Sequence, residues 1–264
     1  MNITNELNLP EPLVDAVRND GYTKGDADFS ITGLMSPPYQ RKLMGEYGGK
    51  ITEDAADRIW SLFGQSVHAI IERSVVDGTG KYEVEKRLYA DCMGKRISGQ
   101  MDLYDIKRKA IQDWKVTSVW SVKDDTYKAD YEKQLNGYAW LARLNGIEVE
   151  TLEVVAILRD WSRLERMRRG NGYPSHSVVV RKIPLWGPDI IQEYIETRVQ
   201  LHKNEDPPVC TPRDKWQRDT TYAVKKDGAK RALKVCQSNT EAQEYINDKG
   251  GDDLIIETRQ GEAV

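Results

Sequence analysis

Two strand-like runs, Ile97–Ile106 and Ala110–Thr117, restrict the fold of this chain more than any other feature. A short basic tip joins them, so they are predicted to form neighbouring strands. Asp102 lies inside the first run. In the second run Asp113 and Lys115 are two residues apart, and on a strand such residues lie on one face. The pattern therefore predicts two carboxylates and a lysine at one place on a sheet.

This combination of side chains suits a divalent-metal site for phosphodiester cleavage. Carboxylate oxygens suit Mg²⁺ or Mn²⁺, and a lysine can orient the attacking water or offset developing negative charge. The alternative is a solvated strand face with a weak ion pair, which is a common state of Asp-x-Lys. The carboxylates stand within apolar runs and not in loops, which favours the metal site.

A long amphipathic helix is predicted upstream, from Thr52 to Val76. Thr52 can cap its start, and Asp77-Gly78 can end it. His68 borders its apolar stripe, a position that suits either a packed histidine or a metal ligand. The stripe consists of Ile59, Phe63, Val67, Ile70 and Ile71.

A second helix is predicted from Asp130 to Leu144, with Asn145-Gly146 as its stop signal. Gln134 and Tyr138 are four residues apart on it, so they share one face. Taken alone, the pair also fits a surface amide beside a boundary tyrosine.

The order of these polar residues along the chain resembles the PD-(D/E)XK nuclease superfamily. Within it, three motifs are similar to the RecB-type branch: G-x-x-D (Gly99 to Asp102), D-x-K, and Q-x-x-x-Y on a helix. That branch includes helicase-linked nuclease domains, a CRISPR adaptation nuclease and many phage exonucleases. The resemblance covers residues 31–160. The full set is His68, Glu85, Asp102, Asp113-x-Lys115 and Gln134-xxx-Tyr138.

The resemblance implies a role for each matching residue. His68, Asp102 and Asp113 would bind the metal, together with the backbone carbonyl of Trp114. Lys115 would position or activate the water and stabilise the pentavalent transition state.

The remaining matches imply supporting roles. Gln134 and Tyr138 would support the site and the DNA end or scissile phosphate. Relatives often carry a further acidic residue on the strand before G-x-x-D. Alternation places both Glu83 and Glu85 on one face there, so either fits, and Glu85 is preferred.

The chain departs from the family pattern in two places. Asp113 stands where many members carry Glu, an accepted variant. Cluster-bearing relatives need four cysteines, whereas this chain has three, Cys92, Cys210 and Cys236, without C-x-x-C spacing. The sequence therefore predicts no iron–sulfur cluster.

The net charge of −3 shows that the chain is not basic overall. DNA affinity would then depend on local patches and on bridging metal ions. One candidate patch is the segment 159–169, and the alternative for it is a solvated loop. Its candidate DNA contacts are Arg159, Trp161, Arg163, Arg166, Arg168 and Arg169. In a second basic run, Lys225–Lys234, a hairpin turn is the stronger interpretation.

The expected organisation has four parts: an irregular segment 1–50 with a short helix near 38–45, a nuclease core 51–203, a linker 204–220, and a small ββαβ unit 221–264. The expected fold class is α/β, a restriction-endonuclease-like core with a central mixed sheet flanked by helices, plus a small C-terminal α+β appendage. Further elements of the core are strands at 152–158 and 177–185 and a helix at 187–203.

Bulk properties restrict the cellular setting. No apolar run approaches the ~20 residues of a membrane span, and the N-terminus lacks a signal-peptide pattern. Three cysteines that show no pairing pattern indicate a reducing compartment. We therefore expect a cytoplasmic protein of a bacterial or phage-infected cell.

The leading functional hypothesis is a Mg²⁺- or Mn²⁺-dependent DNA nuclease, an exonuclease of recombination, repair or phage DNA processing. Its partner would be DNA with single- or double-stranded ends, with a protein partner and homo-oligomers left open. The alternatives are a structure-specific endonuclease on the same scaffold and a non-catalytic DNA-binding subunit. The sequence contains neither a P-loop nor a Gly-x-Ser-x-Gly elbow.

Overall fold

The computed structural model describes residues 2–19, 21, 23–75, 80–122, 129–250 and 253–262. The chain forms two compact units, Met1–Pro207 and Pro208–Val264.

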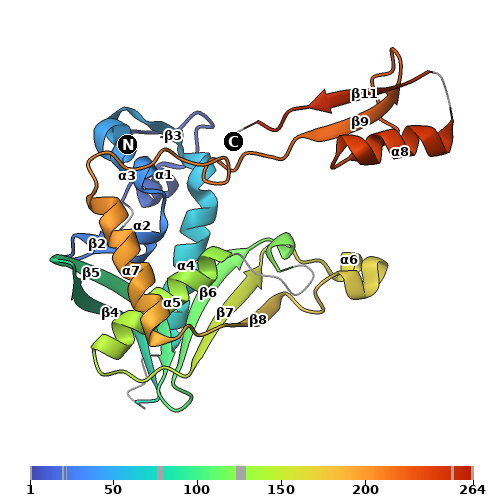
Figure 1. Cartoon of the computed structure of the whole chain (residues 1–264). Coiled ribbons are helices and arrows are strands. Elements are labelled where there is room, and N and C mark those ends of the chain that lie inside the picture. Colours follow the sequence, from blue (N-terminus) through green and yellow to red (C-terminus); the bar gives the residue numbers. More distant parts are fainter. Residues whose placement is uncertain are drawn as a thin grey trace. The chain divides into compact units, whose positions relative to one another are not determined.

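A six-stranded mixed sheet forms the centre of the first unit (Figure 1). Its path is β2-β5-β6-β7-β8, and β4 pairs with β5 beside that path. The β6–β7 and β2–β5 pairs are parallel, whereas the β4–β5, β5–β6 and β7–β8 pairs are antiparallel. The strands are β2 (Phe29–Ser30), β4 (Tyr82–Cys92), β5 (Lys95–Asp105), β6 (Ala110–Thr117), β7 (Thr151–Leu158) and β8 (Val178–Ile183).

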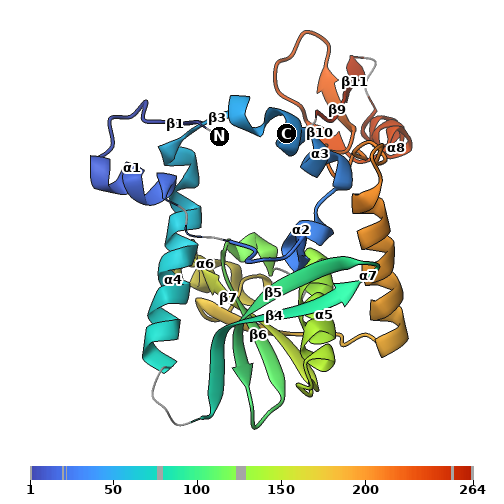
Figure 2. The same cartoon turned by 90° about the vertical axis from the view of Figure 1, so that its left-hand side faces the viewer.

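Helices flank this sheet, and the predicted fold class of the core is confirmed. In Figure 2, α4 (Ile59–Val75) and α7 (Pro188–Lys203) stand on opposite sides of the strands. The buried helix α5 (Ala129–Leu144) packs on β5 through Leu141 and Tyr138, and residues of both elements share the main hydrophobic core. None of the described helices is long and apolar enough to cross a membrane.

The predicted helix start at Thr52 is wrong. Residues Thr52–Asp54 form strand β3, parallel to β1 (Asn2–Thr4), and a short 3₁₀ turn, Ala55–Arg58, precedes α4. The Asp54 carboxylate accepts hydrogen bonds from the backbone N–H of Ala56 at 3.0 Å and of Glu6 at 2.7 Å. Pairing with a segment about fifty residues away thus outweighs the local capping signal. The predicted stop signal lies outside the described residues.

The apolar stripe of α4 is only partly covered. No residue of this helix is buried, and Phe63 and Ile70 are 43% and 55% exposed.

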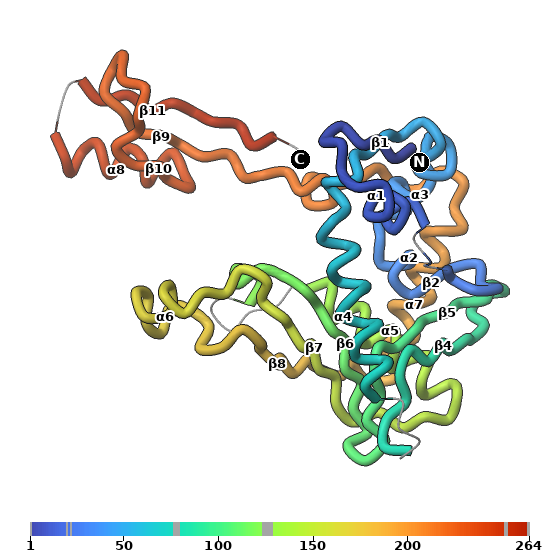
Figure 3. The backbone as a smooth tube through the Cα atoms, turned by 180° about the vertical axis from the view of Figure 1, so that it is seen from behind, coloured from blue at the N-terminus to red at the C-terminus, as the bar shows by residue number. Residues whose placement is uncertain are grey.

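The segment 1–50 is not irregular. It contains α1 (Glu11–Arg18), α2 (Ile31–Met35) and α3 (Pro38–Tyr47), of which α3 corresponds to the predicted short helix. Pro12 and Pro38 lie in the first turns of α1 and α3, where proline is compatible with a helix. The tube view shows α1 beside the start of α4 (Figure 3). These prolines therefore begin helices and do not interrupt them.

The second unit has the predicted order of strand, strand, helix and strand. Its sheet order is β10-β9-β11, and both pairs are antiparallel. The basic run 225–234 spans the turn between β9 and β10, as the hairpin interpretation requires, and three of its lysines are ion-paired to acidic residues. The elements are β9 (Thr221–Lys226), β10 (Lys234–Cys236), α8 (Asn239–Lys249) and β11 (Leu254–Arg259).

Candidate metal centre

The pairing between β5 and β6 runs from Asp105–Ala110 only as far as Leu103–Gln112. Just beyond that point, Asp102 Oδ2 accepts a hydrogen bond from the backbone N–H of Trp114 at 2.7 Å. A side chain thus takes the place of the next strand-to-strand hydrogen bond. This arrangement places a carboxylate where the two strands separate.

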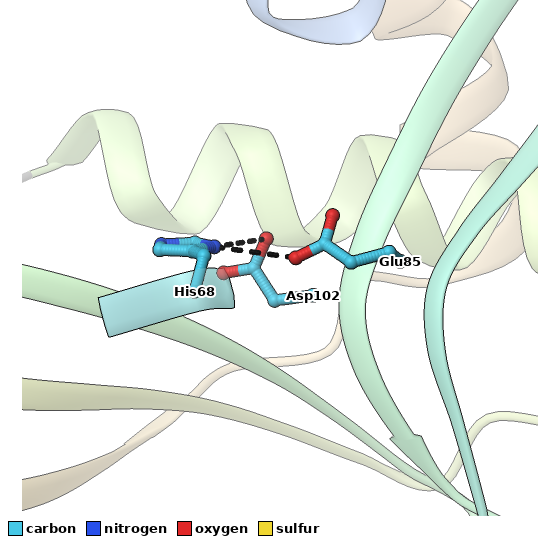
Figure 4. A group of neighbouring side chains, drawn as sticks. All are labelled: His68, Glu85 and Asp102. Carbon is cyan, nitrogen blue, oxygen red and sulfur yellow. Dashed lines mark ion pairs between the residues drawn. The ribbon is translucent and has the colours of Figure 1, made fainter. Parts of the chain in front are cut away.

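A histidine and two carboxylates meet at this point (Figure 4). Nδ1 of His68 lies 3.4 Å from Glu85 Oε1 and 3.5 Å from Asp102 Oδ1. Its Nε2 lies 3.0 Å from the carbonyl oxygen of Trp114. A carbonyl can only accept, so Nε2 carries a proton and Nδ1 is the atom that faces the carboxylates.

These three side chains fit a divalent cation. Their ligand atoms all lie within 4.8 Å of one another. One imidazole nitrogen with two carboxylate oxygens suits Mn²⁺ and Mg²⁺. All three residues are partly buried, and the donors come from α4, β4 and β5.

The surroundings of this site raise the pKa values of His68 and Asp102. The hydrogen bond to Glu85, with the negative charge of Asp102, outweighs burial and raises the pKa of His68. Burial, and then repulsion by Asp113, raises the pKa of Asp102 to about 7. Neighbouring negative charge therefore favours a proton on both groups, and for Asp102 it adds to the larger effect of burial.

Glu85 reaches the cluster through an unusual backbone conformation. Its φ is +47°, in the left-handed region that a non-glycine residue occupies at a cost of about 1–3 kcal/mol. The register pairs Val84 with Leu103 and Lys86 with Met101, so Glu85 lies opposite Asp102.

Glu83 makes a different contact. Both of its carboxylate oxygens accept hydrogen bonds from Lys86 Nζ, at 2.8 and 2.9 Å. The structure therefore brings Glu85, and not Glu83, to His68.

A hydrogen-bond chain that the sequence analysis missed fixes the Glu85 carboxylate. Gln100 Nε2 donates to Glu85 Oε2 at 2.6 Å, and Arg87 donates to the Gln100 side-chain oxygen. Because the guanidinium can only donate, it holds the amide in the orientation that directs NH₂ at Glu85. Gln100 lies two residues before Asp102, and residues two apart on a strand lie on one face. This spacing was the sequence signal that could have identified Gln100.

Asp113 and Lys115 form a neighbouring pair. Lys115 Nζ lies 2.7 Å from Asp113 Oδ2, and Asp113 is 1% exposed. Burial lowers the pKa of Lys115, but the charges of Asp113 and Asp102 outweigh it, so the net shift is upward. Asp113 Oδ1 is buried with no hydrogen-bond partner among the described residues. Of the predicted ligands, Asp113 thus contacts Lys115, and the Trp114 carbonyl contacts His68.

The cluster opens into a cleft of about 680 Å³. Gln134 and Tyr138 line it, and Gln134 Nε2 donates to the Tyr138 hydroxyl at 2.7 Å. Gly99 of the G-x-x-D motif has a packing role. A Cβ there would lie 2.6 Å from Leu141 and 2.9 Å from Tyr138, so glycine allows α5 to approach β5.

The arginine-rich segment is more ordered than a loop. Ser162 is the N-cap of helix α6 (Arg163–Arg169), and its hydroxyl accepts a hydrogen bond from the backbone N–H of Glu165. Arg168 and Arg169 pair with Glu165, and Arg166 donates to backbone carbonyls. The Arg163 side chain is exposed.

Trp161 is held within the protein. Its indole N–H donates to the Pro174 carbonyl at 2.9 Å, and the ring packs against a small core that includes Val119 and Tyr173. Its position suits a structural anchor better than base stacking. Arg159, in contrast, lies over the exposed ring of Trp60, 4.4 Å from its centre.

No family model matches the sequence, and no curated protein matches it either. The chain is similar in structure to the crystal structure of SSO0001, with a TM-score of 0.48 and 18% identity, over 77% of this chain and 88% of that one. It is also similar to a phage related exonuclease from Haemophilus somnus 129PT, with a TM-score of 0.30 and 17% identity, over 70% and 77%. At these scores the likeness assigns neither a family nor an activity to this chain.

Proposed function

We propose that this chain is a metal-dependent deoxyribonuclease that hydrolyses phosphodiester bonds, acting from DNA ends. The observation that carries the proposal is the convergence of His68, Glu85 and Asp102 in an open cleft, with the Asp113–Lys115 pair close enough to act on the charge of Asp102. Metal ligands, a partly buried lysine and an accessible cavity are the parts that metal-assisted hydrolysis requires.

His68, Glu85 and Asp102 would hold Mg²⁺ or Mn²⁺. Asp113 is a further candidate, because its buried Oδ1 lacks a hydrogen-bond partner in the described part of the chain. Such a cation, when bound, polarises a phosphoryl oxygen and makes a bound water more acidic.

Lys115 and two residues of the cleft wall would act on the substrate or on the attacking water. Lys115 places a positive charge beside the carboxylates, where it can orient the attacking water and offset the negative charge of the transition state. The hydroxyl of Tyr138 and the amide of Gln134 line the cleft wall and can donate to the scissile phosphate.

End-labelled linear DNA, single- and double-stranded, tests this proposal with Mn²⁺, Mg²⁺ or EDTA. We expect metal-dependent shortening that Lys115→Ala lowers by at least about 100-fold, since such charge stabilisation contributes about 3–4 kcal/mol. Lys182→Ala is the matched control, because Lys182 is an exposed lysine on β8. Equal cleavage by parent and Lys115→Ala, with both folded, would reject the assignment.

Covalently closed circular DNA separates the two nuclease modes. An enzyme that acts from ends leaves closed circles intact and degrades them after they are linearised. Cleavage of closed circles would assign an endonuclease instead. Tight binding without cleavage of any form would favour the non-catalytic DNA-binding subunit.

A further inference from the structure

Exposed aromatic side chains lie at the start of α4, the helix whose other face lines the cleft. Trp60 is 55% exposed and Phe63 is 43% exposed, and their rings meet edge to face with centres 6.4 Å apart. On the same two turns, Ser61 and Gly64 line the cleft. Along the helix Trp60 lies eight residues before His68, a rise of about 12 Å. The aromatic pair therefore lies on the helix that carries His68, about two turns before it, and outside the residues that line the cleft.

An arginine from another element completes this surface. The guanidinium of Arg159 lies 4.4 Å from the centre of the Trp60 ring. The backbone N–H of Arg159 donates to the Thr117 carbonyl at 2.9 Å, which fixes the arginine at the carboxyl ends of the parallel strands β6 and β7. We call Trp60, Phe63 and Arg159 the aromatic rim.

A second pair of the same type lies on the segments that follow these two strands. Trp120 is 59% exposed, and the guanidinium of Arg169 lies 5.4 Å from its ring centre. Trp120 comes three residues after the end of β6, and α6, which carries Arg169, follows β7. An exposed tryptophan under an arginine thus occurs twice, and in both pairs the arginine comes from the segment that follows β7.

The chemistry of the aromatic rim selects its partner. Exposed aromatic rings stack on nucleobases of any sequence, and arginine adds attraction to the phosphates. Bases can stack on such rings only when they are unpaired. A purely apolar docking face would not require a guanidinium on its most exposed ring. Charge complementarity therefore favours single-stranded DNA over an apolar protein surface.

We propose that the aromatic rim binds unpaired bases of single-stranded DNA and so selects single-stranded or frayed ends for the cleft. The selection of a substrate rests on the proposed nuclease function, whereas the binding does not.

The binding test uses a fluorescein-labelled oligothymidylate, the full chain and EDTA, with anisotropy as the readout. The double variant Trp60→Leu, Phe63→Leu keeps apolar side chains on α4, and circular dichroism checks its fold. Trp216→Leu is the control, because Trp216 is 69% exposed in the other unit. We expect the double variant to weaken binding by about 10-fold or more, since stacking contributes about 1–3 kcal/mol per base. The Trp216 variant and the affinity of a blunt duplex should change little.

Equal affinity of parent and double variant for the oligonucleotide would overturn the proposal. So would a self-association of the parent, measured by sedimentation, that the double variant loses, because the rim would then be covered by a second copy.

A small substrate distinguishes this inference from the proposed function. The 4-nitrophenyl ester of thymidine 5′-phosphate carries no oligonucleotide to stack on the rim. With Mn²⁺, we expect the parent and the double variant to hydrolyse it equally and Lys115→Ala to lose the activity. A parent that binds through the rim but hydrolyses nothing would support the rim and reject the nuclease. Hydrolysis of this small substrate, together with oligonucleotide binding that does not depend on the rim, would support the nuclease and reject the rim.

Discussion

Two histidines on helices of the same unit lie in opposite electrostatic surroundings. His68 on α4 faces two carboxylates, and its pKa is raised. Burial, and then the charge of Arg198, lowers the pKa of His202 on α7 to about 4. Nε2 of His202 lies 3.1 Å from the Leu34 carbonyl and 3.2 Å from that of Ser36, at the end of α2.

The contrast separates a binding site from a packing site. Around His68 the protein concentrates negative charge that a proton or a divalent cation can balance. Around His202 a permanent guanidinium already occupies the carbonyls, since Arg198 donates to Leu34 and Ser36 at 2.6 Å. A second positive charge is unfavourable there. The same side chain is therefore a candidate ligand in one place and a neutral spacer in the other.

The largest expected effect distinguishes the two histidines when each is replaced by glutamine. His68→Gln should lower metal-dependent cleavage by about 100-fold or more, because it removes a ligand from a site that supplies several kcal/mol. We expect Mn²⁺ to raise the Tm of the parent, and His68→Gln should abolish that rise. His202→Gln should retain both responses. Calorimetry with the metal alone checks this, and an unchanged Mn²⁺ affinity in His68→Gln would remove His68 from the ligand set.

Two glutamines, each of which donates a hydrogen bond to a glutamate, allow a second comparison. Gln100 donates to Glu85 at the candidate metal centre, whereas Gln112 donates to Glu153 at 2.8 Å in an ion pair with Arg108. Gln100→Leu should weaken Mn²⁺ binding by about 10- to 100-fold, since it frees a ligand from the group that orients it.

The control for this change is Gln112→Leu, which should leave Mn²⁺ affinity unchanged. Gln100→Glu, which cannot donate from an ionised carboxylate, should behave like the leucine variant. If Gln100→Leu and Gln112→Leu alter the affinity equally, Gln100 does not position Glu85.

The smallest expected effect is a pH dependence of stability from His202. Its folded-state pKa, about 4, lies below the usual value of 6.5. The unfolded chain therefore takes up the proton first as the pH falls. The stabilisation is fully present above pH 6.5 and is lost between pH 6.5 and 4, by on the order of 2 kcal/mol for a half-buried ring.

Urea unfolding in EDTA at pH 7 and pH 4.5 measures this loss. The parent should lose more free energy of unfolding than His202→Gln between the two pH values. If the parent and His202→Gln lose the same free energy of unfolding, protonation of His202 does not destabilise the folded state.

Regular elements with a strong local pattern could be predicted from the sequence. The apolar run Ala110–Thr117 is strand β6 to the residue, and the capped helix 130–144 is α5 within one residue. Predictions failed where distant segments meet. Thr52–Asp54 pairs with Asn2–Thr4, and neither segment carries a strand pattern of its own.

The same limit applies to the candidate site. The residue types and their order along the chain identified His68, Asp102, Asp113, Lys115, Gln134 and Tyr138 as candidates. Strand alternation could not choose between Glu83 and Glu85, because the choice depends on a positive φ at Glu85 and on hydrogen bonds from a neighbouring strand.

The sequence by itself determined which donors this protein has, on which elements they lie and that the core is a mixed α/β sheet. Only the tertiary structure decided which donors meet. Glu85 joins His68 because Gln100 and Arg87 hold it, whereas Asp113 lies with Lys115. The physical reason is that periodicity specifies the direction of a side chain along one element. The distance between side chains of different elements depends on how those elements separate, bend and pack.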